Sequence, residues 1–297
     1  MPFFHPDDQL QTLGDRILAQ TWQQFPSLAR NQLALTWVVY DDPVIVNTGG
    51  AVTPNDFWQQ TVRGFSYRGV ECLDPAELAH LVYLIAIHEW IEQSMIGSSP
   101  ELERAMQDMV VLGNHGAAGL VVDMLTGTTS GPELPPQPFQ TWQQQRNIVN
   151  RYLKSLQWPE LETVNICQKT TAAYGRERQA LGAMLEYRNQ LTTDAIARLM
   201  HSIVGGVAVS AGRSKSMMGG LHQSRLSFAA QVLPSNSQYW SLIGQDGQGC
   251  HEVMYAEVLG MQPFLLAVSV CQDVTQRQAV QNAIIPFLAQ RMLDELS

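Results

Sequence analysis

The sequence is poor in charged residues. Asp, Glu, Lys and Arg make up 15% of its 297 residues, whereas soluble domains usually contain about 25%. The 18 Lys and Arg are outnumbered by 27 Asp and Glu, which gives a formal net charge of -9. No run of basic residues interrupts this acidic balance. Because such a charge opposes binding to a phosphate backbone, we expect no nucleic-acid partner.

Cysteine is scarce and dispersed. The four residues Cys72, Cys167, Cys250 and Cys271 contain no C-x-x-C spacing. This pattern argues against a dense disulfide framework and against a zinc knuckle. We therefore expect free thiols.

Long apolar runs are also missing. The stretch LVYLIAI at 81–87 is interrupted at once by His88 and Glu89, and a membrane-spanning helix needs about 20 apolar residues. The first residues, MPFFHPDDQLQTLGDR, lack a basic segment followed by an apolar one. We expect no membrane span and a cytoplasmic protein.

The first two thirds of the chain carry patterns of both strand and helix. Residues 7–30 have helical spacing, and 32–39 and 43–48 are β-branched or aromatic runs that predict a hairpin of two strands. Helical periodicity returns over 75–125, where Ser99 is a candidate cap. A loop is predicted at 127–138, followed by mostly helical sequence from 142 to 204 with Thr192 or Thr193 as a cap.

The last third returns to strands. Residues 210–220 predict a loop or a short helix, 238–244, 251–259 and 263–270 predict strands, and 276–296 a terminal helix. Strands at both ends imply an α/β (α+β) fold with one antiparallel sheet built from both termini, flanked by helices, and an inserted all-helical subdomain. We expect one domain over 1–297, with a sheet subdomain of 1–70 plus 205–297 and a helical subdomain of 71–204.

One string at the start of the apolar helix has the layout of a known catalytic motif. Pro75-Ala76-Glu77-Leu78-Ala79-His80 precedes LVYLIAIHEW, and this layout resembles P-A-S-x-x-K of the serine β-lactamases and penicillin-binding proteins. In that family the reactive Ser and its Lys lie one helical turn apart. The resemblance places Glu77 at the nucleophile and His80 at the lysine.

Two further strings extend the resemblance in the expected order. Gly113-Asn114-His115 stands where the family has S-D-N, and Leu242-Ile243-Gly244 stands where it has K-T-G. Similar strings at 125–134, 174–178 and 188–200 widen the likeness to about residues 30–295. The resemblance implies a β-lactamase/transpeptidase-like fold in a degenerate member of the class A-related serine hydrolases.

The substitutions remove the family's chemistry at every motif. A carboxylate replaces the nucleophilic hydroxyl, and Leu242 replaces the cation that would bind a substrate carboxylate. We therefore expect no catalytic residues, no cofactor, and a pseudoenzyme that binds, scaffolds or regulates an unknown protein or peptide partner. If the ancestral cleft is open, we expect Glu77, His80, His115, Trp240, Leu242 and Ile243 to line it.

An alternative keeps chemistry in the same cleft. Glu77 and His80 lie three residues apart on one helical face, where they can form an ordinary ion pair. If Glu77, His80 and His115 converge, they could act as acid and base in a hydrolase, or bind zinc with His251 or Cys250 as a remote fourth ligand. Glu177 could be imagined as a deacylating carboxylate, but we expect it to join Arg176 and Arg178 in a structural charge cluster.

Overall fold

The computed structural model describes residues 3–184, 187–224, 226–246, 249–271 and 277–296. Its core is a six-stranded sheet with the order β1-β3-β2-β6-β5-β4. β1 pairs with β3 in parallel and every other pairing is antiparallel. The strands are β1 (Phe4–Pro6), β2 (Leu33–Val39), β3 (Val62–Tyr67), β4 (Gln238–Gln245), β5 (Gly249–Glu257) and β6 (Phe264–Cys271). The expected sheet from both ends of the chain is confirmed, except that β1 makes it mixed.

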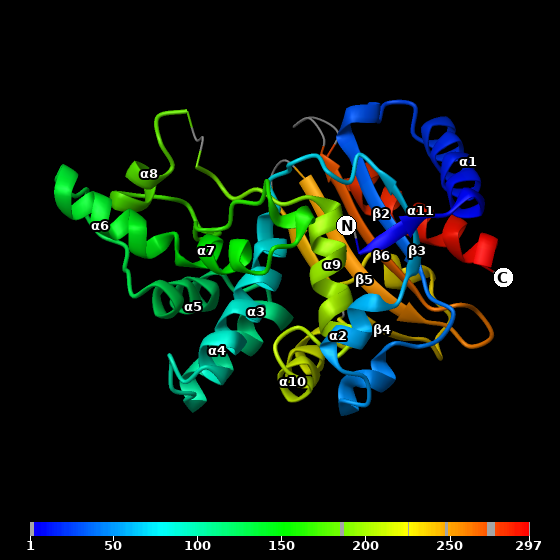
Figure 1. The fold of residues 1–297 in the computed structure, drawn as a ribbon. Helices are drawn as coiled ribbons and strands as arrows, with labels where there is room; N and C mark the ends of the chain where they lie inside the picture. The colour runs from blue at the N-terminus through cyan, green and yellow to red at the C-terminus, as the bar shows by residue number, and fades with distance from the viewer. Residues whose placement is uncertain (1–2, 185–186, 225, 247–248, 272–276, 297) are drawn as a thin grey trace.

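Helices cover both faces of this sheet, and most of the remaining helices form a lobe beside it (Figure 1). The α-helices are α1 (Asp8–Gln24), α2 (Pro54–Gln59), α3 (Ala79–Glu92), α4 (Pro100–Val111), α5 (His115–Thr126), α6 (Pro136–Arg146), α7 (Ile148–Ser155), α8 (Arg176–Ala180), α9 (Thr193–Val204), α10 (Ala211–Leu221) and α11 (Arg277–Leu296). The 3-10 helices are η1 (Arg30–Gln32), η2 (Ile45–Gly49), η3 (Ala76–Leu78), η4 (Pro159–Leu161) and η5 (Ala229–Val232).

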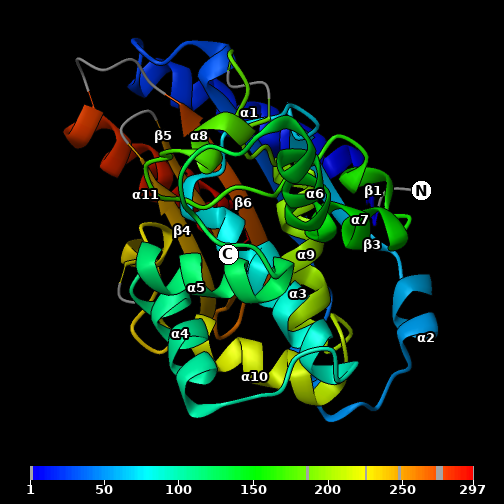
Figure 2. The same cartoon turned by 90° about the vertical axis from the view of Figure 1, so that its left-hand side faces the viewer.

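Alternation along the strands divides the apolar residues between two cores. On one face, α1 and α11 pack against the sheet, with Leu266 of β6 among the buried residues. On the other face, α9 lies across β2, β5 and β6, and the same core continues into α3. Helix α3 buries every side chain except Glu89 and Glu92. A helix that is apolar on nearly all sides is stable only inside the protein. Helix α3 accordingly packs between α4 and α5 of the lobe and α9, which covers the sheet (Figures 1 and 2).

The expected caps are present. Ser99 accepts a hydrogen bond from the Leu102 N–H at the start of α4, and Thr192 accepts one from the Ala195 N–H at the start of α9. The predicted helix at 7–30 ends earlier, at Gln24. Of the two alternatives for 210–220, the helix is confirmed: Ser210 caps α10. The terminal helix is described from Arg277, and its predicted first residue, Gln276, lies outside the described residues.

The predicted strand at 43–48 is wrong, since this segment contains the 3-10 helix η2. Its buried Asn47 donates to the Gly205 carbonyl and accepts the Val52 N–H, which ties the segment into a turn. The strand that pairs with β2 in its place is β3, at 62–67. The hairpin inferred from two neighbouring apolar runs therefore does not form.

The expectation of mostly helical sequence up to 204 is wrong between α7 and α9. Among the described residues from 162 to 191, α8 is the one α-helix. Asn189 replaces helical hydrogen bonds here: its side chain accepts the N–H groups of Cys167 and Gln168 and donates to the Gln168 carbonyl. Amide side chains that bond to the backbone in this way stabilise irregular structure.

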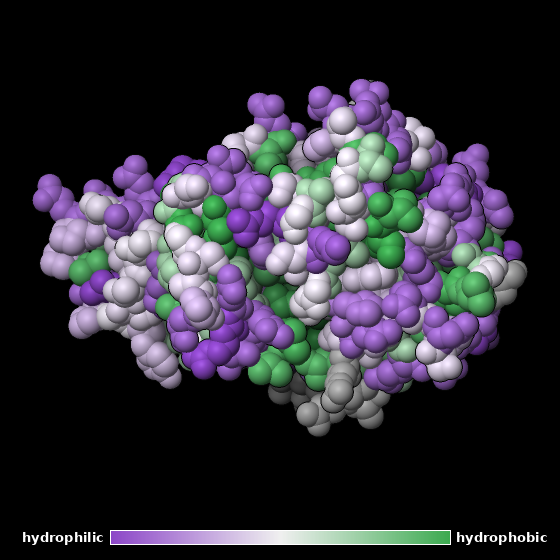
Figure 3. All heavy atoms as spheres, turned by 90° about the horizontal axis from the view of Figure 1, so that it is seen from below, coloured by the Kyte–Doolittle hydropathy of each residue, from purple (hydrophilic) through white to green (hydrophobic). Residues whose placement is uncertain are grey.

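The surface view in Figure 3 is mostly hydrophilic, with apolar side chains gathered near its middle. In the described part of the chain, no helix combines the length and the apolar character needed to cross a membrane.

Candidate functional site

A close approach of backbone brings the three motif positions together. A Cβ atom on Gly244, at the end of β4, would lie 2.6 Å from the Pro75 carbonyl oxygen and 3.0 Å from the Glu77 nitrogen. Only glycine fits so close to another backbone. A Cβ atom on Gly113 would lie 4.0 Å from Cγ of Glu77. The start of α3, the turn before α5 and the end of β4 therefore meet around Glu77.

The carboxylate of Glu77 bonds to two of these elements. Its Oε2 accepts the Gln245 backbone N–H at 2.6 Å, and its Oε1 lies 3.3 Å from Nε2 of His115. The preceding residue, Ala76, has a φ of 46°. A left-handed conformation is strained for a residue with a Cβ and is often found at functional sites. The Glu77 side chain that follows this turn reaches β4 and His115.

A threonine links the two histidines. Oγ1 of Thr170 lies 3.1 Å from Nε2 of His80 and 3.0 Å from Nδ1 of His115, while Nδ1 of His80 lies 3.1 Å from the Met109 carbonyl oxygen. A carbonyl only accepts, so Nδ1 of His80 carries the hydrogen and Nε2 accepts the Thr170 hydroxyl. Thr170 is then free to accept from Nδ1 of His115.

These bonds give the chain of contacts a direction. His115 contacts Thr170 through its Nδ1 and the Glu77 carboxylate through its Nε2. The order of donation runs from His115 through Thr170 and His80 to the Met109 carbonyl.

Burial determines the charge of His80. Its side chain is fully buried, and this burial is the main reason that the pKa of His80 falls to about 4, with the neighbouring His115 lowering it further. The hydrogen bond to Met109 opposes the shift. His80 is therefore neutral at physiological pH, and it does not supply the positive charge that a lysine would supply at this position.

A cavity of about 390 Å³ opens beside Glu77 and His115. Its lining is polar and carries charges of both signs. The described residues that line it are Asp74, Ala76, Glu77, His115, Gln168, Lys169, Thr170, Thr171, Leu181, Arg188, Asn189, Gln245 and Asp246.

Four of the expected lining residues lie elsewhere. His80 is buried beneath the cavity, with Thr170 between it and the opening. Trp240 and Leu242 point from β4 into the core shared with α3, and Ile243, on the opposite face of the strand, packs in the core beside α11. The apolar groove that these β4 residues would have formed is therefore filled by the protein itself.

The expected ion pair between Glu77 and His80 does not form, because His80 faces Met109 and Thr170. Nor do the two imidazoles and Glu77 surround one point: both rings direct a nitrogen at the Thr170 hydroxyl. The candidate fourth ligands lie apart, since His251 bonds to Ser269 and Cys250 is buried in the core beside α11. The described residues contain no cluster of three His, Cys, Asp or Glu arranged for a metal.

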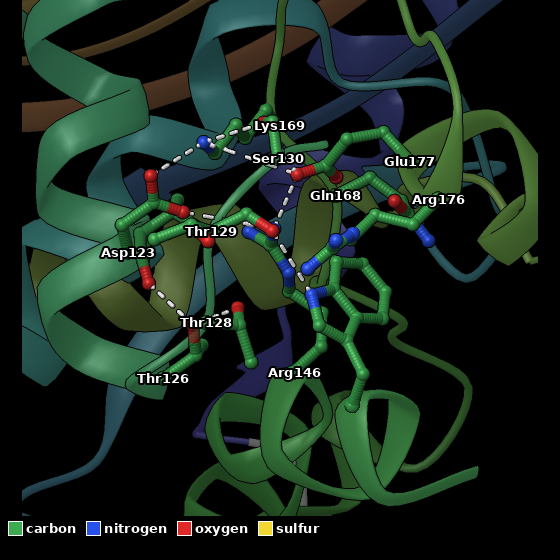
Figure 4. A network of polar contacts seen from close by, with 12 residues as sticks. Asp123, Thr126, Thr128, Thr129, Ser130, Arg146, Gln168, Lys169, Arg176 and Glu177 are labelled. Carbon is green, nitrogen blue, oxygen red and sulfur yellow. Dashed lines mark hydrogen bonds and ion pairs between the residues drawn. The ribbon is translucent and has the colours of Figure 1, made fainter. Parts of the chain in front are cut away.

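Glu177 joins a charge cluster, but its partners are not the expected Arg176 and Arg178. It accepts from Arg146 and from the Ser130 hydroxyl, and Nζ of Lys169 lies 3.8 Å away. Asp123 completes the cluster by pairing with Lys169 at 2.7 Å (Figure 4). Arg176 and Arg178 bond instead to backbone carbonyls. The cluster anchors Lys169, the neighbour of Thr170, to α5.

Two functional candidates carried no signal in the sequence. Thr170 lies in the irregular segment between η4 and α8, and Gln245 contributes its backbone N–H and not its side chain. Neither belongs to a spaced motif. Each becomes visible only when the fold brings it to Glu77 or to the histidines.

Comparison with solved structures identifies the fold. A β-lactamase from Sphaerobacter thermophilus DSM 20745 superposes with a TM-score of 0.65 at 13% identity, covering 94% of this chain and 96% of that one. A Burkholderia vietnamiensis β-lactamase gives 0.63 at 14% identity, with coverages of 94% and 95%. A mutant PBP-A, solved as an acyl-enzyme complex with penicillin G, gives 0.67 at 11% identity, with coverages of 99% and 98%. No family model and no curated protein matches the chain.

The β-lactamase/transpeptidase-like fold expected from the motif order is thereby confirmed. At these identities the likeness establishes the architecture over nearly the whole chain. Activity is a separate question, which depends on the residues around Glu77.

The buried network predicts a specific titration. Unfolded His80 takes up a proton near its ordinary pKa of 6.5 and folded His80 only near 4, so the unfolded state binds more protons between these values. The contribution of His80 to stability is therefore present above pH 6.5 and is lost as the pH falls toward 4. In ¹⁵N NMR spectra its ring, assigned by comparison with His80→Gln, should stay neutral down to about pH 4. Titration near 6.5 would show that the network with Thr170 is open in solution.

Proposed function

We propose that the protein is a catalytically inactive β-lactamase-like protein that acts as a binding, scaffolding or regulatory partner through the cavity beside Glu77. The observation that carries this proposal is the hydrogen bond from the Gln245 N–H to the Glu77 carboxylate. Acyl transfer needs a nucleophile at the reacting centre and free N–H donors for the developing oxyanion. Here a carboxylate stands at the position of the nucleophile and already uses the neighbouring donor.

The effect of this arrangement on acyl transfer is large. Loss of a single oxyanion donor costs an enzyme about 100- to 1000-fold in rate. The same site also has a neutral imidazole at the lysine position, because burial lowers the pKa of His80 to about 4. The occupied N–H donor and the neutral imidazole both act against formation of the acyl-enzyme. The family's acyl-enzyme chemistry is therefore unsupported at Glu77.

The cavity supports the binding half of the proposal. About 390 Å³ is of the size used for small ligands. Arg188 contributes positive charge to the lining, and Asp74 and Asp246 contribute negative charge, while the ammonium of Lys169 is already paired with Asp123. Such a lining suits a polar ligand or a peptide segment of mixed charge. We also propose that the protein acts in the cytoplasm.

The first test is acylation. The protein should form no covalent adduct with a fluorescent penicillin and should not hydrolyse a chromogenic cephalosporin, with an active class A β-lactamase as the positive control. The double variant Glu77→Ser/His80→Lys should gain slow adduct formation, because it supplies a hydroxyl and an ammonium and frees the Gln245 N–H. Intact-mass spectrometry detects the adduct in either protein, and absorbance follows hydrolysis of the cephalosporin. Hydrolysis by the unaltered protein, or an adduct with it, would contradict the proposal.

The second test concerns the partner. Thr171 is exposed at the cavity, so Thr171→Trp should block the opening without disturbing the core. Thr163→Trp, at another exposed threonine that does not line the cavity, is the matched control. Affinity purification from the native lysate with quantitative mass spectrometry should show a protein that is lost with the first variant and retained with the control. Identical sets of proteins from both variants would count against binding through this cavity.

A second candidate function is hydrolysis with altered Glu/His chemistry. The observation that favours it is the Thr170 hydroxyl, which donates to Nε2 of His80 beside the pair of His115 and Glu77. In such a reaction Oγ1 of Thr170 would attack a carbonyl carbon and its proton would pass to His80. The leaving group would take that proton, and water would then release the acyl group from Thr170.

The low pKa of His80 opposes this chemistry, because a general base works best when its pKa lies near the operating pH. Thr170→Val, which keeps the shape of the side chain, separates the two functions in a screen of aryl esters and anilides. We expect the unaltered protein and Thr170→Val to hydrolyse these substrates no faster than buffer alone. A rate that falls about 100-fold or more in Thr170→Val would establish the hydrolase, and metal analysis of tag-free protein would test its metal-assisted form.

A further inference from the structure

A second cavity lies on the other side of the segment that carries Thr170. It has a volume of about 360 Å³ and is enclosed by α6, α7, α8 and the chain around 165–168. Gln168 lines both this cavity and the one beside Glu77. The described residues that line it are Trp142, Gln143, Gln144, Arg146, Asn147, Arg151, Asn165, Cys167, Gln168, Ala180 and Tyr187.

The charge of this lining differs from that of the molecule. None of the described lining residues is acidic, although the chain carries a formal net charge of -9. Of the two arginines in the lining, Arg146 is paired with carboxylates behind it, whereas Arg151 forms no salt bridge with a described residue. The remaining polar groups are mostly amides, which donate as well as accept. A cavity with this lining attracts an anion.

Arg146 is the better defined of the two arginines. Its side chain is only 2% exposed, rests on the Trp142 ring at 4.6 Å, and pairs through Nη2 with Glu177 and Asp123. Its Nε and Nη1 have no hydrogen-bond partner in the described structure. Buried donors without an acceptor are rare and costly, and each requires an explanation. In the same cluster, Oε2 of Glu177 and Oδ1 of Asp123 are also buried without a hydrogen-bond partner, so the polar atoms around Arg146 are not fully satisfied by the described residues.

Arg151 is held at the rim from the neighbouring helix. Its Nη1 donates to the Gln144 carbonyl at 2.6 Å. The Arg151 side chain therefore reaches from α7 to the last turn of α6. The Arg151 residue is exposed to solvent. The two arginines thus approach the cavity from two helices, one beneath it and one at its edge.

We propose that this cavity binds a small anion through carboxylate or phosphate oxygens, with Arg146 and Arg151 as the residues that recognise it. The site is separate from the cavity beside Glu77 and does not depend on the proposed function. Its neighbour in the fold, the cluster of Glu177, Asp123 and Lys169, holds the Arg146 side chain in place.

The probes are benzoate, its neutral isostere benzamide, and inorganic phosphate, titrated into the full chain by NMR. Benzoate or phosphate should bind and benzamide should not. The anion that binds with the higher affinity shows whether the site prefers a carboxylate or a phosphate. Cys167 lines the cavity, so the bound anion should slow its modification by a methanethiosulfonate reagent, measured by peptide mass spectrometry. The partly exposed Cys271, on β6, should react at an unchanged rate.

Arg151→Gln is the informative variant, because Arg146→Gln would leave Glu177 without its main partner. Arg178→Gln is the matched control: Arg178 also donates to a backbone carbonyl but does not line the cavity. Arg151→Gln should weaken binding by roughly threefold or more, as expected for an exposed charge, and Arg178→Gln should leave it unchanged. Absence of binding, equal binding of benzamide, equal effects of both variants, or unprotected Cys167 would each overturn the proposal.

Discussion

The carboxylate of Glu77 joins the start of the buried helix α3 to the end of strand β4, and the rest of the site is arranged around this contact. It is possible because Gly244 lets the backbone of β4 approach that of Pro75 and Glu77. A negative charge that accepts a backbone N–H makes a stronger hydrogen bond than a neutral group does. The same bond ties the end of β4 to the turn that precedes α3.

The histidine chain follows from the burial of α3. His80 lies on a helix that is apolar on nearly every side, and a charged group at this position would have to lose its hydration. A neutral imidazole held between the Met109 carbonyl and the Thr170 hydroxyl satisfies both of its nitrogens without a charge. His115, at the start of α5 and half exposed, places its Nε2 beside the Glu77 carboxylate. The burial of His80 thus decides the protonation of that ring.

The segment from Cys167 to Thr170 separates two cavities with different electrostatic character. Asn189 fixes its backbone, and Lys169 is anchored through Asp123 to α5. On one side lie charges of both signs around Glu77, and on the other side lie two arginines. Because one irregular segment forms a wall of both, the buried charge cluster of Arg146 and Glu177 positions residues for each cavity at once.

The sequence by itself determined the class of fold, the apolar helix and the three C-terminal strands, because these depend on periodicity and on short local strings. Local periodicity failed at 43–48, where the side chain of Asn47 bonds to Gly205, and between α7 and α9, where Asn189 bonds to the backbone. Only the tertiary structure placed Thr170 between two histidines, turned Trp240 and Leu242 into the core, and gave Glu177 its partners Arg146 and Lys169. These contacts join residues far apart in the chain, and their existence depends on packing that no local pattern records.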